Sequence, residues 1–227
     1  MRTTRRIAAL MAVAALAFAA CAPAAEPETL LDRVEAAEKI VMSTDPLYPP
    51  QSSLRPDGTF EGFDIDVGTE IARRLGVAIE FTTPSWDVIT AGSWAGRWDF
   101  SVGSMTVTTP RERVLAFSEP YYFTPAQIAA STASGITTLE GLAGKTICVG
   151  AATTYFDWMM GTLDLGGYTP EAGPPEGSEV TTLESDRLCA EAWQAGRRDF
   201  EGWLSSKTTV ELAIEEGLPL VKVGDPV

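Results

Sequence analysis

The sequence contains neither histidine nor asparagine, and each absence excludes a class of function. Without histidine the chain cannot build a Ser-His-Asp or Cys-His catalytic relay, nor the commonest zinc sites. Without asparagine it has no N-glycosylation sequon. Basic residues are also few, since 17 Lys and Arg stand against 31 Asp and Glu for a net charge of −14. Nucleic acid is therefore not an expected partner, because its phosphate backbone is bound by basic patches.

The sequence also lacks a hydrophobic run long enough to span a membrane. The longest, Ile7 to Ala20, has 14 residues, whereas a spanning helix needs about 20. Arginines precede this run and small residues follow it, which is the order of an export signal. We predict a signal over residues 1–20, a tether over 21–37, and a periplasmic or extracellular location.

Cys21 directly follows the apolar run. The sequence Phe18-Ala19-Ala20-Cys21 resembles a bacterial lipobox, so we expect Cys21 to be lipidated and to anchor the mature protein to a membrane. Cleavage by ordinary signal peptidase, which would release the protein, is the alternative.

Two further cysteines follow Cys21, namely Cys148 and Cys189, 41 residues apart. In an oxidising compartment an even number of cysteines favours pairing, so we predict a disulfide between them. Two buried free thiols are the alternative.

From residue 38 onward the hydrophobic pattern alternates between strands and amphipathic helices. The expected strands cover residues 40–44, 78–82, 100–104, 146–150, 180–183, 200–204 and 220–223. The expected helices cover residues 64–75, 86–93, 154–163 and 185–195. Residues 121–135 are interpreted as a crossing and residues 166–177 as a surface loop.

This alternation predicts an α/β fold of two lobes, each a sheet flanked by helices. The lobes are expected over residues 38–126 and 127–223, with residues 224–227 beginning a return to the first lobe. Small ligands are expected between the lobes, at the carboxyl ends of the strands.

Two motifs resemble a phosphate-binding loop and a calcium loop, but neither matches its full pattern. Gly144-Lys145-Thr146 matches the end of a phosphate-binding loop, but residue 139 is Leu where that pattern needs Gly. Asp57, Asp64 and Asp66 lack the spacing of a calcium loop, and Asp64 is expected to cap the helix that it begins. We therefore assign no metal and no cofactor.

The segment from residue 104 to residue 121 is the most informative. Ser104-Met105-Thr106-Val107-Thr108-Thr109-Pro110-Arg111, followed by Phe117-Ser118-Glu119-Pro120-Tyr121, resembles the ligand-clamp segment of bacterial solute-binding proteins, family 3. These proteins are the amino-acid-binding components of ABC importers. The resemblance extends to residues 45–50, 58–66, 144–146, 153–155 and 195–199, and so covers nearly the whole mature chain.

The resemblance implies a ligand site. The carboxylate shell would consist of Arg111, Thr106, Ser104 and Thr154, and Trp86 and Tyr48 would be its walls. The further positions implied are Asp45, Met105, Thr153 and Leu204. A planar guanidinium, short hydroxyls and backbone N–H groups suit an α-carboxylate.

Three of these residues have plainer alternative interpretations. Arg111 could be a surface residue paired with Glu112 or Glu119. Trp86 could pack in a core, and Asp45 could serve only its turn.

Three departures from the family pattern qualify the resemblance. Leu204 stands where family members hold the ligand ammonium with an acidic residue, which favours an atypical amino acid or another small carboxylate as ligand. Ala152 stands where the family prefers glycine. The sequence stops near Gly224, where family members return to the first lobe, so we expect a truncated sequence that lacks the closing elements of that lobe.

The leading hypothesis is an exported, monomeric solute-binding protein. It would capture a small amino acid or related carboxylate and deliver it to an ABC permease. An exported dehydratase of the cyclohexadienyl or arogenate type is the alternative, with Glu201 and Asp45 as candidate acids. A pocket with an arginine clamp and no carboxyl group of raised pKa would favour the binder. The ligand domain of a sensor is the third possibility.

Overall fold

The computed structural model describes residues 29–226, as two compact units that divide after Ala37. The first unit contains helix α2 (Leu30–Ala37), where the sequence predicted only a tether. Thr29 and Asp32 hydrogen-bond each other at its start, with 3.0 Å from Thr29 N to Asp32 Oδ2 and 3.1 Å from Asp32 N to Thr29 Oγ1. The predicted export signal and the predicted lipidation at Cys21 lie outside the described residues. Within residues 29–226, no helix is both long enough and apolar enough to cross a membrane.

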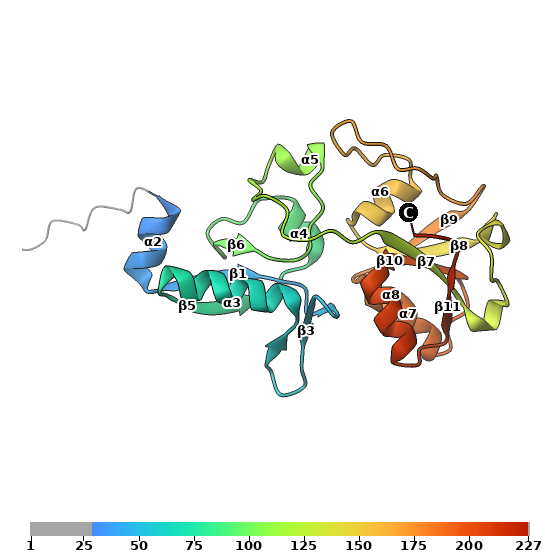
Figure 1. Ribbon diagram of the computed structural model, residues 1–227, viewed down its shortest axis with the longest axis horizontal. Coiled ribbons are helices and arrows are strands. Elements are labelled where there is room, and N and C mark those ends of the chain that lie inside the picture. Colours follow the sequence, from blue (N-terminus) through green and yellow to red (C-terminus); the bar gives the residue numbers. More distant parts are fainter. Residues whose placement is uncertain (1–28, 227) are drawn as a thin grey trace, which may run out of the picture. The chain divides into compact units, whose positions relative to one another are not determined.

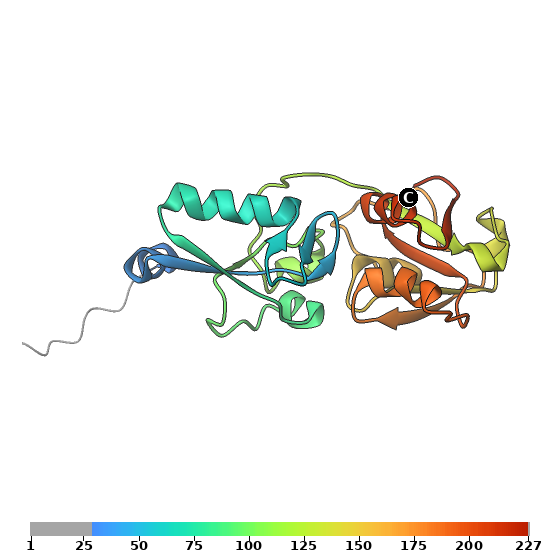
Figure 2. The same cartoon turned by 90° about the horizontal axis from the view of Figure 1, so that it is seen from below.

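A three-stranded parallel sheet forms the first lobe of the second unit. Its order is β5 (Ala78–Thr82), β1 (Lys39–Ser43), β6 (Phe100–Ser101). Helix α3 (Phe63–Leu75) covers one face, and α4 (Trp86–Thr90) lies on the other (Figure 2). Met42 on β1 is fully buried beneath α3, and Gly68 permits the approach because a Cβ there would lie 2.1 Å from Met42 Sδ.

A small antiparallel sheet precedes α3 and was not predicted. It consists of β2 (Leu47–Tyr48), β3 (Ser52–Leu54) and β4 (Phe60–Glu61). Gly62, at a φ of 123°, then caps α3. Only glycine fits this position without a shift of the backbone, because a Cβ there would lie 2.3 Å from the Gln51 carbonyl oxygen. The prediction that Asp64 caps this helix is therefore wrong, and Asp64 lies within the first turn.

The second lobe is built on a five-stranded mixed sheet. Its order is β11 (Leu220–Val223), β7 (Ala126–Ser131), β10 (Gly202–Ser206), β8 (Thr146–Gly150), β9 (Glu179–Leu183). Strand β7 runs antiparallel to both of its neighbours, and the β10–β8 and β8–β9 pairs are parallel. Its helices are α6 (Thr154–Met159), α7 (Asp186–Gln194) and α8 (Lys207–Glu215) (Figure 1).

Two predictions for this lobe are corrected. Residues 121–135, interpreted as a crossing, contain strand β7, whose residues from Gln127 to Ser131 are all buried. Helix α8 was not predicted. The remaining short elements of the chain are α5 (Thr109–Glu112) and two 3₁₀ turns, Thr132–Ser134 and Glu140–Leu142.

The predicted α/β architecture is confirmed, and the element ends shift where side-chain packing decides them. Strand β10 begins two residues later than expected, because Phe200 packs on Trp193 before the strand starts. Helices α4 and α6 are shorter than predicted. The loop over residues 166–177 is confirmed, with one isolated bridge between Leu165 and Tyr168 at its start. The residue bounds of the two lobes stay predictions.

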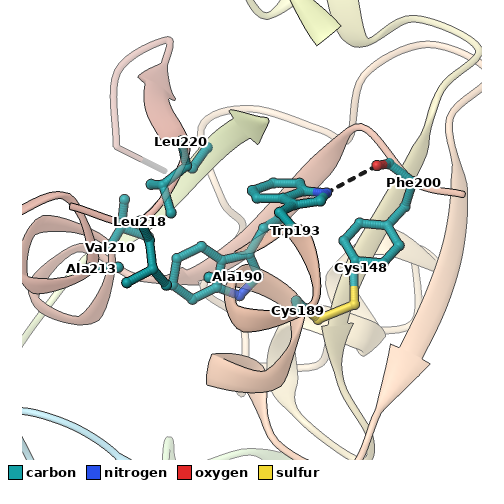
Figure 3. Packing of buried hydrophobic residues seen from close by; sticks show 11 residues of the cluster. Cys148, Cys189, Ala190, Trp193, Phe200, Val210, Ala213, Leu218 and Leu220 are labelled. Atoms are coloured by element: carbon teal, nitrogen blue, oxygen red, sulfur yellow. Dashed lines mark hydrogen bonds between the residues drawn. A yellow bond between two sulfur atoms is a disulfide. The ribbon is translucent and has the colours of Figure 1, made fainter. Parts of the chain in front are cut away.

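The predicted disulfide is present in the core of the second lobe. Cys148 on β8 and Cys189 on α7 are bonded and have no exposed surface (Figure 3). Beside them Trp193 stacks on Phe200 with ring centroids 5.4 Å apart, and its indole N–H donates to the Phe200 carbonyl at 3.1 Å. The bond fixes α7 against the sheet, and α7 begins at the cavity described below.

Replacing both Cys148 and Cys189 with alanine is expected to lower the free energy of unfolding by about 4 kcal/mol. The physical reason is that the bond closes a loop of 41 residues in the unfolded chain. Urea unfolding followed by tryptophan fluorescence measures the loss. Reduction of the unsubstituted protein should reproduce it and should not affect the double variant. An unchanged free energy of unfolding would contradict the prediction.

Candidate ligand-binding site

A cavity collects residues that follow the carboxyl ends of β1, β6, β8 and β9, as the topology predicted. It encloses about 50 Å³. Eight of the ten predicted ligand residues line it: Asp45, Tyr48, Trp86, Ser104, Thr106, Arg111, Thr153 and Thr154. We call it the main cavity.

Arg111 is buried at one end of the main cavity. It lies in the short helix α5, where Thr108 is the cap and accepts a hydrogen bond from Arg111 N at 3.3 Å. The guanidinium donates from Nη1 to the Thr106 carbonyl at 2.9 Å and from Nη2 to the Ala152 carbonyl at 3.0 Å. Its side chain makes no ion pair within the described residues, so the surface pair with Glu112 or Glu119 is excluded. Burial lowers the pKa of Arg111.

The partner residue Ala152 adopts a backbone conformation that glycine adopts more easily. Its φ is 58°, in the left-handed region, and its carbonyl accepts from Arg111 Nη2. The next residues continue into α6: Thr153 Oγ1 donates to the Gly150 carbonyl at 2.7 Å and accepts from Phe156 N at 3.3 Å. The departure from glycine noted in the sequence thus falls on a constrained position beside Arg111.

Asp186, which the sequence analysis missed, lies at another part of the same cavity. Its carboxylate accepts from Gly150 N at 2.5 Å and from Ser205 Oγ at 3.1 Å, and only 4% of the residue is exposed. Burial raises the pKa of Asp186 to about 7, although both hydrogen bonds oppose the shift. Gly150 is required here, since a Cβ would lie 2.4 Å from Asp186 Oδ1. An acidic residue at the start of a helix, directly after strand β9, was the signal that could have identified it.

Asp45 stabilises the turn that it begins and also lines the main cavity. Its Oδ1 accepts from Leu47 N at 2.7 Å, which is the turn interaction considered as the alternative. Its Oδ2 lies 3.5 Å from Ser185 Oγ, and burial raises its pKa. Glu184, whose side chain is exposed, also lines the cavity. The cavity therefore holds three carboxyl groups and one guanidinium.

Aromatic side chains form the walls. The hydroxyls of Tyr48 and Tyr155 lie 3.4 Å apart, and both side chains line the cavity. Trp86 is half-buried, and the guanidinium carbon of Arg111 lies 5.8 Å from its ring centroid. Trp86 also borders an adjoining cavity of about 130 Å³, whose apolar lining includes Leu47, Ile89 and Leu188. The alternative that Trp86 packs in a core is excluded.

Two predicted site residues do not line the cavity. Met105 is half-buried outside it. Leu204 is 1% exposed and packs in the core with Ile128 and Ile147. The hydrophobic pattern predicted a strand that ends at residue 204, whereas β10 ends at Ser206.

Glu201, a candidate acid of the dehydratase alternative, lies at the other end of the sheet. Its Oε2 accepts from the backbone N of Thr146, where β8 begins, at 3.3 Å. The site lies where β8 ends, so Glu201 is excluded as an acid of this cavity. Among the described residues, no group of three or more His, Cys, Asp or Glu is arranged to hold a metal ion.

The sequence profile of bacterial extracellular solute-binding proteins, family 3, matches residues 40–224. The chain belongs to this family.

Among its relatives, the L-cystine-binding protein TcyJ of Escherichia coli K12 is 27% identical over 195 residues, 84% of this chain and 69% of that protein. The lysine/arginine/ornithine-binding periplasmic protein of Escherichia coli K12 is 29% identical over 196 residues, 86% of this chain and 68% of that protein.

Solved structures of amino acid-binding proteins share the fold of this chain. An ancestral amino acid-binding protein described as a precursor of cyclohexadienyl dehydratase superposes with a TM-score of 0.71. The two are 24% identical, and the superposition covers 86% of this chain and 81% of that one. The two-lobed fold of the solute-binding family is thus shown for this chain.

The stability of the protein without ligand is expected to fall as pH rises from about 5 to about 7. Asp64 and Asp186 have pKa values raised to about 6 and about 7 by burial, so in this range the native protein binds more protons than the unfolded chain. Each group contributes at most about 1.4 kcal/mol per pH unit. Carboxyls of lowered pKa, such as Glu70 beside Arg73 and Arg74, have the opposite effect, which ends at about pH 5 because in the unfolded chain they titrate at their ordinary pKa of 4.5.

Urea unfolding at about pH 5 and about pH 8 measures this dependence. The Asp186→Asn variant, which cannot titrate at that position, should show a shallower fall. Stability that rises over this range would contradict the assignment of raised pKa values.

Proposed function

We propose that this protein captures an α-amino acid outside the cytoplasmic membrane and delivers it to an ABC permease. The observation that carries the proposal is that a buried guanidinium, Arg111, and a buried carboxyl, Asp186, line the same small cavity without contacting each other. An α-amino acid carries one carboxylate and one ammonium, which match these two groups. Two of the five N–H groups of Arg111 donate to backbone carbonyls, so others remain for a ligand carboxylate.

Asp186 takes the place of the acidic residue that the sequence did not show at residue 204. Its raised pKa reflects the absence of a nearby cation, since burial disfavours its charged form. A ligand ammonium would supply that cation and stabilise the ionised carboxylate. We therefore propose an ordinary α-amino acid in place of the atypical amino acid or other small carboxylate that Leu204 favoured.

The remaining charge of the cavity supports a ligand with a cationic side chain. After Arg111 pairs with the ligand carboxylate and Asp186 with the α-ammonium, Asp45 and Glu184 still line the cavity. An acidic remainder favours a second positive charge on the ligand. A relative that is named for binding lysine, arginine and ornithine is consistent with this ligand class.

Capture requires that the ligand stabilise a closed arrangement of the two lobes. Arg111 already donates across to Ala152, and Thr106 Oγ1 lies 3.5 Å from Thr154 Oγ1. A ligand bound to Arg111, Ser104 and Thr106 on one lobe and to Thr154 and Asp186 on the other would bind the closed state better than the open state. The proposed partner is the permease of an ABC importer, and the proposed form is a monomer, exported and anchored through Cys21.

Replacing Arg111 with alanine or lysine is expected to weaken binding of L-lysine at least tenfold. A charge-assisted hydrogen bond contributes about 1.5–3 kcal/mol, and lysine cannot reproduce the bidentate geometry. Thermal shift identifies binding because a ligand of the native state raises the unfolding temperature, and calorimetry then gives the dissociation constant. Arg113→Ala, an exposed arginine two residues away, is the matched control and should bind normally. Equal affinity for the Arg111 variants would contradict the proposed clamp.

An exported dehydratase is the second candidate function. The observation that favours it is the raised pKa of Asp186, since a carboxyl that stays protonated near neutral pH can act as a general acid. The sequence analysis took a pocket without a carboxyl group of raised pKa as the mark of a binder. The main cavity contains such a carboxyl, so this criterion does not exclude the enzyme.

Product analysis separates the two candidates. Incubation with prephenate and with L-arogenate is expected to return both compounds unchanged, whereas L-lysine binds and is recovered intact. Formation of the aromatic product by the unsubstituted protein, lost in Asp186→Asn, would overturn the binder and establish the dehydratase.

A further inference from the structure

A second buried carboxylate, Asp64, lies behind the ligand residues and has no role in the site so far. It lies in the first turn of α3 and has no exposed surface. Its backbone N donates to the Gln51 carbonyl at 2.8 Å, which fixes its position. Its carboxylate accepts from Ser104 Oγ, at 2.9 and 3.0 Å from its two oxygens, and from the Tyr121 hydroxyl at 2.8 Å.

Ser104 is held in an unusual backbone conformation by these two partners. Its φ is 53°, in the left-handed region that non-glycine residues rarely adopt. Its backbone N donates to the Tyr121 hydroxyl at 2.9 Å, and that hydroxyl donates in turn to Asp64. Asp64 therefore holds Ser104 twice, directly through the side chain and through Tyr121 at the backbone.

These bonds decide what Ser104 can offer to a ligand. A serine residue has two hydrogen-bond donors, its backbone N–H and its hydroxyl O–H. Tyr121 takes the first and Asp64 takes the second, because an ionised carboxylate can only accept. Ser104 lines the main cavity. The groups that it still has for a ligand are its carbonyl oxygen and its hydroxyl lone pairs, all of which are acceptors.

We infer that Asp64 is a positioning residue of the ligand site, which acts through Ser104 and turns it into a hydrogen-bond acceptor for the ligand ammonium. This inference rests on the proposed function, and it moves Ser104 from the carboxylate shell, where the resemblance placed it, to the ammonium. The ammonium then has acceptors on both lobes, Ser104 on the first and Asp186 on the second.

The Asp64→Asn variant tests the inference because it keeps the shape and changes the hydrogen-bonding pattern. Its amide has one oxygen to accept and an NH₂ group that donates, so one of the two hydroxyls loses its acceptor. Binding of L-lysine, measured by calorimetry at about pH 8, where Asp64 is ionised, is expected to weaken about tenfold. Tyr121→Phe removes the acceptor of Ser104 N and should also weaken binding of L-lysine.

The matched control is Asp66→Asn. Asp66 lies in the same first turn of α3 and its side chain is exposed, so this variant removes the same charge near the same helix end. It is expected to bind L-lysine within twofold of the unsubstituted protein.

A variant cycle shows whether Asp64 acts through Ser104. In a background that carries both Ser104→Gly and Tyr121→Phe, glycine keeps the left-handed backbone and both links from Asp64 to residue 104 are removed. There, Asp64→Asn is expected to change L-lysine binding less than twofold. A tenfold loss that persists in that background would overturn the inference, because Asp64 would then act independently of Ser104. Urea unfolding of each variant at the same pH separates loss of folding from loss of binding.

A second ligand tests the assignment to the ammonium. Competition with 6-aminohexanoate, which differs from L-lysine only by lacking the α-ammonium, should change less than twofold in Asp64→Asn. Equal weakening of both ligands would overturn the assignment while leaving the proposed function intact. Failure of the unsubstituted protein to bind any amino acid would overturn both proposals.

Discussion

The site depends on the burial of opposite charges that the protein itself leaves only partly compensated. Arg111 has two backbone carbonyls and no carboxylate as hydrogen-bond partners, and Asp186 has an amide and a hydroxyl and no cation. Burial disfavours the charged form of each, which lowers one pKa and raises the other. A zwitterionic ligand would complete both environments at once, so the same desolvation that weakens the empty protein would favour the bound one.

The sheets determine why these groups meet. Parallel strands of one sheet end at a common edge, which brings together the residues that follow β1 and β6 on the first lobe and those that follow β8 and β9 on the second. Both groups line the same cavity, although they are spread over more than half of the sequence. Gly150 shows how closely the local sequence is matched to this edge. It ends β8, its N–H binds Asp186, and a side chain there would displace that carboxylate. The disulfide between β8 and α7 holds the same two elements together from within the core.

The sequence predicted the architecture and most of the cavity, and it failed where tertiary register decides. Strands such as residues 78–82 and 146–150 were predicted correctly because their apolar runs are bounded by turn formers. Leu204 was misplaced because the start of β10 depends on the packing of Phe200 against Trp193, which no local pattern reports. Asp186 was missed for the complementary reason: its role comes from a glycine 36 residues earlier in the chain. Strand β7, a run of small residues after Pro125, carries too weak a pattern to identify without its partners.

Two residues of the ligand site have a strained backbone. In the described part of the chain, four non-glycine residues have positive φ, and two of them, Ser104 and Ala152, lie at the site. Each such conformation costs about 1–2 kcal/mol, and each is held by the hydrogen bonds already described, from Asp64 and Tyr121 in one case and from Arg111 in the other. Glycine would remove the cost at both positions. At residue 104 it would also remove the hydroxyl through which Asp64 reaches the cavity, so the strain at Ser104 follows from that connection, whereas the side chain of Ala152 contributes no such bond.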